Sequence, residues 1–291
     1  MQVTELGLGT NLADANLWKT NYEYGELDSN GTTVTSKNTG NISKQILTVP
    51  GTNFVQAYKY DSLYRIIEAK ETTGTNTTPN WIQNWGYDRY GNRTAFSQNI
   101  AGNTASANPT VDQYTNRFTN LTDFAYDKNG NITRDLTANA QSRTFVFNAD
   151  NKQTEVKDAN GSTVGQYSYD GEGKRVKKYI QSTGETTIFV YSSGKLISEY
   201  STVVAPASVA KVAYTTTDHL GSPRVITDAL GQVASRRDFM PFGEDLNVGV
   251  GNRTGDTGLK YSMPGDNVRQ KFTGYQKDNE TQLDFAEIFL T

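Results

Sequence analysis

Short stretches of alternating apolar and polar residues run through the chain, and clusters of Gly, Asn and Asp separate them. The stretches are rich in β-branched and aromatic residues, a composition typical of strands. The pattern predicts strands at 65–69, 93–96, 132–136, 144–147, 152–156, 164–169, 175–180, 186–191 and 195–200. Apolar residues at helical spacing do not extend beyond about two turns anywhere. The sequence therefore predicts an all-β protein.

A motif that begins with Tyr-Asp repeats between these strands. Strong copies begin at Tyr87-Asp88, Tyr126-Asp127 and Tyr169-Asp170; weaker copies begin at Tyr60-Asp61 and Phe147-Asn148, and a shortened one at Tyr191-Ser192. From position 126 to 147 is 21 positions, and from 147 to 169 and from 169 to 191 is 22 each. This period suits two strands and their turns, whereas a βαβ unit needs about thirty residues.

The copy at Tyr126 shows why these residue types recur. Asp127 is expected to accept a hydrogen bond from the backbone N–H two residues later and so to open a turn. Asn129-Gly130 then supplies residues that tolerate positive φ, as tight hairpin turns require. Gly91 and Gly173 occupy the position of Gly130 in the other strong copies, and Asn151 occupies it in the Phe147 copy.

Two places depart from this pattern. In the Tyr60 copy the glycine position holds Tyr64, which disfavours positive φ, so we expect a different turn type there. Between Tyr87 and Tyr126 the spacing widens to 39 positions. The Gly-, Asn-, Ala- and Ser-rich stretch at 99–109 in this gap predicts an inserted loop.

Composition favours an extended or hollow sheet over a thick core. Of the 291 residues, 35% are hydrophobic, and 17 Tyr and 12 Phe provide much of the apolar area. Tyrosine suits a thin core because its ring buries area while its hydroxyl reaches water. The net charge is −3, with both signs interspersed. The basic run at 174–178 is interpreted as a solvated strand face, so we expect no nucleic-acid partner.

The sequence lacks the residues that certain kinds of site and targeting signal require. There is no cysteine, which excludes disulfides and Cys-ligated metals. The first twenty residues hold no apolar segment of a secretion signal, and no apolar run predicts a membrane span. If the protein is exported, we expect either another route or a longer chain of which this is a piece.

Three later segments carry a family resemblance. Residues 218–231, 237–244 and 272–284 follow the array in order, and the first reads DHLGSPRVITDALG. Together with the repeats, they resemble the RHS family of YD-repeat proteins and its repeat-associated core, related to teneurins and to the shells of bacterial toxin complexes. The matching core positions are Asp218, His219, Gly221, Pro223, Arg224, Pro241, Gly243 and Gly274.

The resemblance implies a spiral of β-hairpins that forms the wall of a cocoon-like shell around a C-terminal effector. The sequence also departs from the family. Gln282 replaces a usual glycine, and Glu287–Thr291 stands where the family continues toward its self-cleavage element. We therefore expect the self-cleavage element and any toxin to be missing from this sequence.

Residues that could carry chemistry also have structural interpretations. His219 is the only histidine, and a triad with Asp218 and Ser222 is disfavoured because neighbours on a strand point to opposite faces. The alternative is that Asp218 and Gly221 shape a turn in which His219 packs. Acidic pairs at Glu244/Asp245 and Asp278/Glu280 would need to converge in a pocket to act as acid and base.

Two segments of the sequence have features of binding sites. The loop at Asp127 weakly resembles a calcium loop, but it lacks the later bidentate glutamate of an EF-hand. Exposed aromatic side chains, for example Trp81 and Trp85, would allow glycan binding; alternatively, these two residues pack in the core.

The sequence thus predicts consecutive antiparallel hairpins in a curved or spiral sheet. The expected regions are divergent N-terminal repeats at 1–55, a YD-repeat array at 56–213 and a core-like region at 214–291. The expected function is a structural segment of a secreted or cell-surface bacterial toxin shell, without catalytic residues, cofactor or metal. The alternatives are a module that binds glycans or a cell-surface protein and, third, a self-cleaving core. Expected partners are the C-terminal toxin, other shell segments, and further copies through open strand edges.

Overall fold

The computed structural model describes residues 2–11, 13–136, 142–203, 212–261, 268–281 and 283–285. The described residues form β-strands joined by turns, with short 3-10 turns at Thr35–Lys37 and Phe272–Gly274. The prediction of an all-β fold built from consecutive antiparallel hairpins is confirmed. Among these residues, no helix is long and apolar enough to cross a membrane.

The chain divides into two compact units. The first unit comprises Met1–Pro109 and Lys211–Gly274, and the second comprises Thr110–Ala210 and Tyr275–Thr291. The core-like region predicted at 214–291 thus contributes to both units. The division of the sequence into divergent repeats at 1–55, a YD-repeat array at 56–213 and a core-like region at 214–291 stays a prediction.

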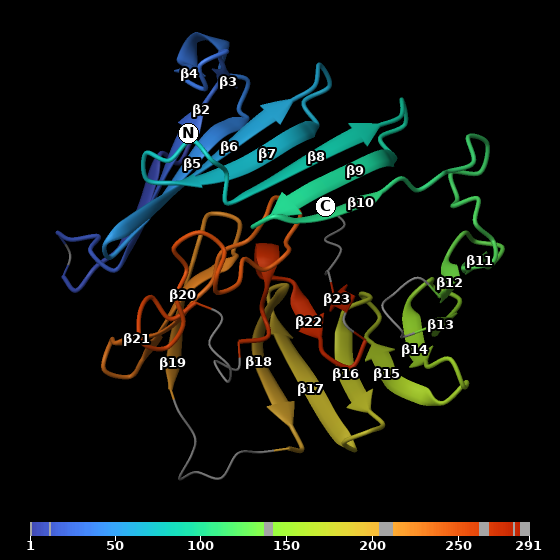
Figure 1. Cartoon of the computed structure of the whole chain (residues 1–291). Coiled ribbons are helices and arrows are strands. Elements are labelled where there is room, and N and C mark those ends of the chain that lie inside the picture. Colours follow the sequence, from blue (N-terminus) through green and yellow to red (C-terminus); the bar gives the residue numbers. More distant parts are fainter. Residues whose placement is uncertain are drawn as a thin grey trace. The chain divides into compact units, whose positions relative to one another are not determined.

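The first unit contains an eight-stranded sheet whose strands neighbour one another in chain order (Figure 1). Its strands are β1 (Glu5–Leu8), β2 (Trp18–Tyr24), β5 (Ile42–Val49), β6 (Thr52–Tyr60), β7 (Ile66–Thr73), β8 (Trp81–Tyr87), β9 (Arg93–Ile100) and β10 (Asn103–Ala107). A small hairpin of β3 (Glu26–Leu27) and β4 (Thr33–Val34) is inserted after β2. A separate sheet holds β19 (Ala213–Thr217), β20 (Pro223–Asp228) and β21 (Val233–Arg236).

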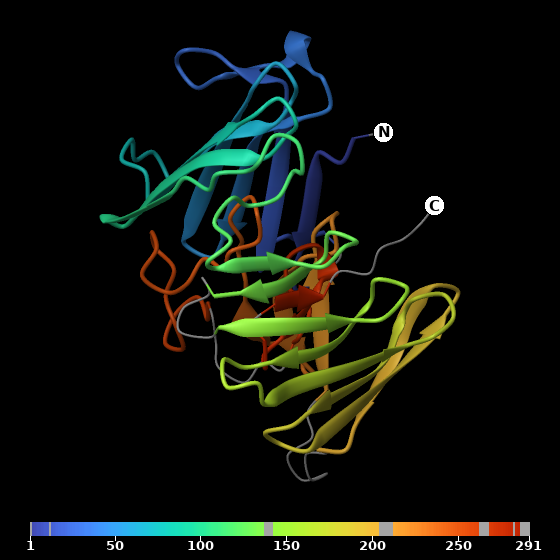
Figure 2. The same ribbon diagram turned by 90° about the vertical axis from the view of Figure 1, so that its right-hand side faces the viewer.

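The second unit repeats this plan, and Figure 2 shows its strands following one another from green to gold. Its eight-stranded sheet contains β11 (Phe124–Tyr126), β12 (Ile132–Asp135), β13 (Arg143–Phe147), β14 (Gln153–Lys157), β15 (Thr163–Tyr169), β16 (Arg175–Ile180), β17 (Glu185–Ser192) and β18 (Lys195–Ser201). A last hairpin pairs β22 (Gln276–Asp278) with β23 (Leu283–Phe285).

Alternation along the strands decides which face is buried. In β8, Trp81, Gln83 and Trp85 are buried while the residues between them are partly exposed. In the first unit, Trp18, Leu47 and Phe54 of the sheet pack with Val225 and Tyr261 of the later segment. One face of the first sheet is therefore covered by residues that follow it by more than a hundred positions in the chain. In the second unit, Phe145, Val156 and Tyr167 form the core.

The repeated turn is a three-residue loop closed by a left-handed residue. Asp127 N–H donates to the Asn131 carbonyl at 3.0 Å, and Gly130 N–H donates to the Asp127 carbonyl at 3.2 Å. The Asp127 Oδ1 atom accepts the N–H groups of Asn129 and Asn131, both at 2.9 Å. Gly130 has φ 95°, and the strand register shifts by one residue beside the turn. This is a type I turn followed by a glycine bulge, so Asn129 itself needs no positive φ.

The same hydrogen bonds recur in both units, including at places where the sequence pattern was not recognised. They form at turns that begin with Asp28, Asp61, Asp88, Asp127, Asn148, Asp158, Asp170, Asp218 and Asp228. The shortened copy has a different turn: Ser192 pairs directly with Lys195, and Ser193 and Gly194 both have positive φ.

Two local expectations are wrong. The turn at Tyr64 is not of a different type: Tyr64 adopts φ 61° and donates its N–H to Asp61 like the glycines elsewhere. The hydrogen bonds of Asp61 hold the backbone in this conformation despite the side chain. The stretch at 99–109 is not an inserted loop, because β10 pairs with β9 through a two-residue turn at Ala101-Gly102. An exposed edge strand needs no alternation of apolar and polar residues, so the composition of this stretch resembles that of a loop.

The repeat tyrosines bind neighbouring hairpins together. The hydroxyl of Tyr87 donates to the Ile66 carbonyl at 2.8 Å, and that of Tyr169 donates to the Gln153 carbonyl at 2.7 Å. Tyr60 and Tyr191 make the same bond to the carbonyls of Ile42 and Arg175. Each acceptor is the first or second residue after an earlier turn, at the start of a strand. Tyr126 differs, because its hydroxyl accepts the Phe118 N–H.

Removal of one such hydroxyl should weaken the second unit. We expect Tyr169→Phe to lower the free energy of unfolding by about 1 kcal/mol, since the Gln153 carbonyl loses its donor. Burial raises the pKa of Tyr169 from 10.0 to about 12. The unfolded tyrosine therefore loses its proton first, so this stabilisation is complete below pH 10 and is lost as the pH rises toward about 12.

Urea unfolding followed by circular dichroism measures both effects. The control is Tyr114→Phe, because the Tyr114 side chain is 87% exposed. Equal stability of the two variants at neutral pH, or a difference between them that does not shrink by pH 11, would contradict the role assigned to the Tyr169 hydroxyl.

Candidate functional site

The repeat residues singled out in the sequence lie at one kind of place, the hairpin turns. Asp61, Asp88, Asp127 and Asp170 each accept backbone N–H groups within their turn. Gly91, Gly130 and Gly173 hold the left-handed position with φ between 80° and 95°. Both Asp127 carboxylate oxygens accept hydrogen bonds from the turn, the second from Asn131 Nδ2 at 2.8 Å. The repeat Asp and Gly residues therefore stabilise the hairpin turns.

The first core-like segment contains two further copies of the same turn. Asp218 Oδ1 accepts the N–H groups of Leu220 and Ser222, and Gly221 has φ 85°. Asp228 and Gly231 repeat the arrangement at the next turn. The sequence signal for this, Asp followed by Gly three positions later, was available in both places.

The geometry does not assemble a triad around His219. The His219 Nδ1 atom lies 3.1 Å from the Tyr22 hydroxyl, and the two rings meet edge to face at 4.8 Å. Ser222 Oγ instead accepts the Thr273 N–H at 3.0 Å. His219 is exposed at its turn and rests against Tyr22 of β2, which favours the structural alternative.

The remaining core-like positions join the segments of the first unit. Pro223 begins β20 and precedes Arg224, whose guanidinium lies 3.0 Å from Asp238. Pro241 lies in a turn that Gly243 closes with φ 99°. A β-carbon at Gly243 would lie 3.0 Å from the β-carbon of Phe272. Gly274 has φ 76° and packs beside the Gly221 carbonyl.

A buried cluster of charges fixes the later segment to the first sheet. The Arg253 guanidinium binds Glu71 of β7 at 2.6 and 2.8 Å and Asp238 at 2.8 and 3.0 Å. Arg224 also pairs with Asp238, and all four side chains are buried. The Arg253 guanidinium carbon lies 3.9 Å from the centre of the Phe54 ring.

Asp238 and Arg253 stay ionised because they are paired. Burial alone would raise the pKa of Asp238, but Arg253 and Arg224 outweigh that effect and hold it below its usual value. For Arg253, burial acts to lower the pKa, and Asp238 and Glu71 raise it above its usual value. Burial, reinforced by Asp238, raises the pKa of the neighbouring Tyr261 phenol well above 10.0.

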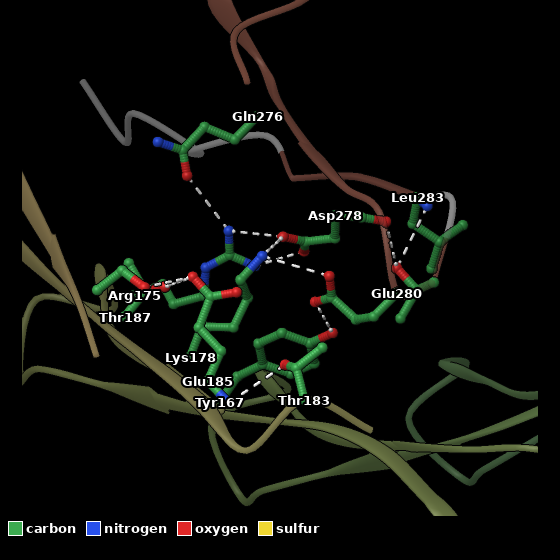
Figure 3. Close-up of polar contacts among 12 residues, drawn as sticks. Tyr167, Arg175, Lys178, Thr183, Glu185, Thr187, Gln276, Asp278, Glu280 and Leu283 are labelled. Carbon is green, nitrogen blue, oxygen red and sulfur yellow. Dashed lines mark hydrogen bonds and ion pairs between the residues drawn. The ribbon is translucent and has the colours of Figure 1, made fainter. Parts of the chain in front are cut away.

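The second unit contains a matching cluster, shown in Figure 3. Arg175 of β16 binds Asp278 of β22 at 2.5 and 3.1 Å. Lys178 Nζ lies 3.1 Å from Asp278 and 3.3 Å from Glu280. The Tyr167 hydroxyl donates to Glu280 at 3.1 Å. Burial, followed by the charges of Glu280 and Asp278, raises the pKa of Tyr167.

This cluster corrects the interpretation of the basic run at 174–178. Lys177 is exposed, but Arg175 and Lys178 are buried, with 2% and 3% of their surface accessible. The register shifts between Ser168 and Tyr169, which leaves Val176 as the extra residue in β16. The bulge places Arg175 on the same face as Lys178, whereas simple alternation would separate them.

The acidic pairs differ in their surroundings. Asp278 and Glu280 do converge, but on Lys178 and within a buried network of paired charges, and Asp278 also lines a pocket of about 390 Å³. Asp245 pairs with Lys271 at 3.2 Å near the surface. Among the described residues, no group of three or more His, Asp or Glu side chains could hold a metal ion. Trp81 and Trp85 are buried at 1% and 5% exposure, so neither offers a ring to a glycan. Gln282 and residues 286–291, where the family pattern breaks, lie outside the described residues.

The sequence of the chain is similar to part of two known bacterial proteins. No protein-family model matches the chain. It is 24% identical over 246 residues to the tRNA nuclease WapA of Bacillus subtilis and 23% identical over 244 residues to the tRNA3(Ser)-specific nuclease WapA of Bacillus spizizenii. Each match covers 77% of this chain but only 9% of the relative.

The fold is that of part of a toxin-complex protein. A crystal structure of TcdB2-TccC3 matches 98% of this chain with a TM-score of 0.60 at 16% identity. The complex TcdB2-TccC3-Cdc42 matches 97% with a TM-score of 0.58 at 16% identity. This chain spans 18% and 17% of those chains, respectively.

Breaking the cluster of the second unit should destabilise that unit strongly. We expect Arg175→Met to reduce the free energy of unfolding by about 3–5 kcal/mol, because Asp278 then keeps a buried charge with fewer partners. Lys177→Met removes the same charge from the exposed face of the same strand and should change stability by about 0.5 kcal/mol or less. Urea unfolding monitored by circular dichroism compares the two, and similar losses would contradict the assignment.

Proposed function

We propose that this chain is a wall segment of an RHS-type toxin shell, and that it encloses or presents an effector without acting on substrates itself. The observation that carries the proposal is the fold match to TcdB2-TccC3 over almost the whole chain. The resemblance of the three core-like segments and the similarity to WapA support the same assignment.

The construction of the sheets also supports a wall. Within each sheet, neighbouring strands follow in chain order, so a sheet extends simply by the addition of hairpins. Twisted hairpins that share ladder hydrogen bonds curve as they accumulate. The buried charge clusters at Arg253 and Arg175 then hold later segments of the chain against the buried face of each sheet.

The proposed partners are other segments of the same shell and a C-terminal effector that lies outside this sequence. The relatives named as tRNA nucleases make a nuclease one candidate class for such an effector. A secreted or cell-surface location is part of the same proposal. The structure offers no particular support for a cell-surface protein as partner.

A wall segment without its neighbours should associate through its strand edges. β10 is the last strand of the first sheet, and its residues are exposed. We expect the average mass from light scattering to rise with protein concentration. Ala105→Lys should reduce this association, because a lysine on an edge strand disfavours further pairing.

Ala159→Lys is the matched control, since it adds the same charge at an exposed turn position. It should associate like the unsubstituted chain. A monodisperse monomer at all concentrations, or equal effects of the two substitutions, would contradict an open wall edge at β10.

The competing proposal, a self-cleaving core, makes a different prediction. We expect the purified chain to keep a single intact mass of 32.1 kDa through prolonged incubation. Mass spectrometry at several pH values between 4 and 9 provides the measurement, because cleavage by a carboxylate pair would depend on pH. A fragment that accumulates with time would overturn the non-enzymatic assignment, provided that added protease inhibitors do not suppress it.

A further inference from the structure

A pocket of about 670 Å³ lies beside β11, the first strand of the second sheet (Figure 1). Its apolar wall contains the rings of Phe118, Phe124 and Tyr126. The Phe118 and Phe124 rings stack with their centres 4.5 Å apart and their planes at 30°. The Tyr126 hydroxyl accepts the Phe118 N–H at 3.0 Å and so ties the loop before β11 to the strand. The rings are therefore in place before a ligand arrives, which lowers the entropy cost of binding.

Two half-buried arginines, Arg117 and Arg134, also line this pocket. Neither forms an ion pair within the part of the chain that the structure describes. The Arg117 guanidinium carbon lies 5.1 Å from the centre of the Tyr126 ring, and its Nη2 donates one long hydrogen bond, 3.5 Å, to the Asp127 carbonyl. Arg134 Nη2 donates to two carbonyls of the preceding loop at 3.0 and 3.3 Å. A guanidinium has five N–H donors, so both arginines keep unused donors.

Unpaired guanidiniums depart from the pattern elsewhere in the molecule. Arg65 binds the Asp61 carboxylate at 2.7 Å, and Arg175 binds that of Asp278 at 2.5 and 3.1 Å. At Arg134, by contrast, the enclosed Nε atom has no hydrogen-bond partner among the described residues. A buried donor without an acceptor is costly, and an anion would supply acceptors to both guanidiniums.

The charges that line the pocket favour a ligand with a single negative charge. Its lining also contains the carboxylate of Asp112, whose Oδ1 atom accepts the N–H groups of Thr115 and Tyr114 at 2.8 and 3.0 Å. These hydrogen bonds, first those from Thr115, lower the pKa of Asp112, so this carboxylate is ionised at neutral pH. Two guanidiniums and one carboxylate leave a net positive charge of one in the lining. A monoanion neutralises that charge, whereas a dianion would exceed it.

We propose that this pocket binds an aromatic monocarboxylate, with its rings against Phe118 and Phe124 and its carboxylate on Arg117 and Arg134. Guanidinium groups bind carboxylates through paired, parallel N–H···O bonds. Aromatic rings pack on one another in offset or edge-to-face arrangements and gain more from this than from burial of area alone. The volume falls within the range for small-molecule sites. The site lies wholly in the second unit and does not depend on the proposed role as a shell wall.

The experiment is a titration of the full chain by saturation-transfer difference NMR with three probes of matched size. Diphenylacetate carries both the rings and the charge, diphenylacetamide lacks the charge, and dicyclohexylacetate lacks the aromatic faces. We expect diphenylacetate to bind with a Kd of about 1 mM or tighter. The amide should bind about tenfold or more weakly, because it loses the charge-assisted hydrogen bonds. The saturated acid should bind about threefold or more weakly, because it cannot stack.

Arg117→Met should weaken the Kd of diphenylacetate by about tenfold or more, since one guanidinium is lost. Arg89→Met is the matched control. Arg89 is an exposed arginine of the first unit that stacks on Tyr90 at 4.5 Å, and it lies outside this pocket. This substitution should leave the Kd unchanged. Both variants should keep the thermal midpoint within about 4 °C of the unsubstituted chain, which shows that they fold.

The proposal is overturned if diphenylacetate shows no transfer, or if the amide or the saturated acid binds as tightly as diphenylacetate. It is also overturned if folded Arg117→Met keeps the Kd of the unsubstituted chain, or if Arg89→Met weakens binding equally. If Arg117→Met does not fold, the comparison of the three probes on the unsubstituted chain decides.

Discussion

The fold depends on one local interaction, the pair of backbone N–H groups that a turn-opening Asp or Asn accepts through its side chain. That interaction fixes a three-residue loop and places a left-handed residue before the return strand. Beyond the turn the register shifts by one residue, at Thr133 and at Val176, so side chains there change face relative to a plain hairpin. In β16 this shift brings Arg175 onto the buried face, where it meets Asp278. A long-range ion cluster thus depends on a bulge that lies three residues beyond the left-handed Gly173.

In each unit, a buried cluster of ion pairs neutralises the charged side chains on the buried face of the sheet. A sheet face lined with polar residues such as Glu71 or Lys178 cannot be covered by an apolar segment alone, because an unpaired buried charge is costly. Each covering segment supplies the opposite charge, and each central arginine also stacks on a phenylalanine ring at 3.9 Å. Apolar packing therefore provides area, while the charges specify which segment fits which sheet.

The sequence was sufficient for features whose causes are local. Strand positions, the Asp turn and the left-handed Gly or Asn follow from residues within five positions of one another, and they agree with the structure at Gly130 and Asn151. The failures have non-local causes. The burial of Arg175 and Lys178 depends on acidic residues about a hundred positions later, and the pairing of β10 depends on an edge that is exposed and so lacks apolar alternation. The prediction of a different turn type at Tyr64 was wrong for another reason: the turn's hydrogen bonds outweigh the preference of this tyrosine for negative φ.

The uniformity of the turn makes its exceptions informative. Where a glycine would satisfy the backbone at no cost, selection for stability alone has no reason to keep a strained tyrosine. At Asn151 the substitute is the next-best residue for the left-handed region, and stability explains it. At Tyr64 it does not, because the ring is exposed, its neighbours Tyr58 and Tyr60 are held by their own hydrogen bonds, and a pocket opens beside all three. A repeat array tolerates such a strained turn, since each hairpin contributes its own turn and the loss of stability at one turn leaves the hydrogen bonds of the others intact.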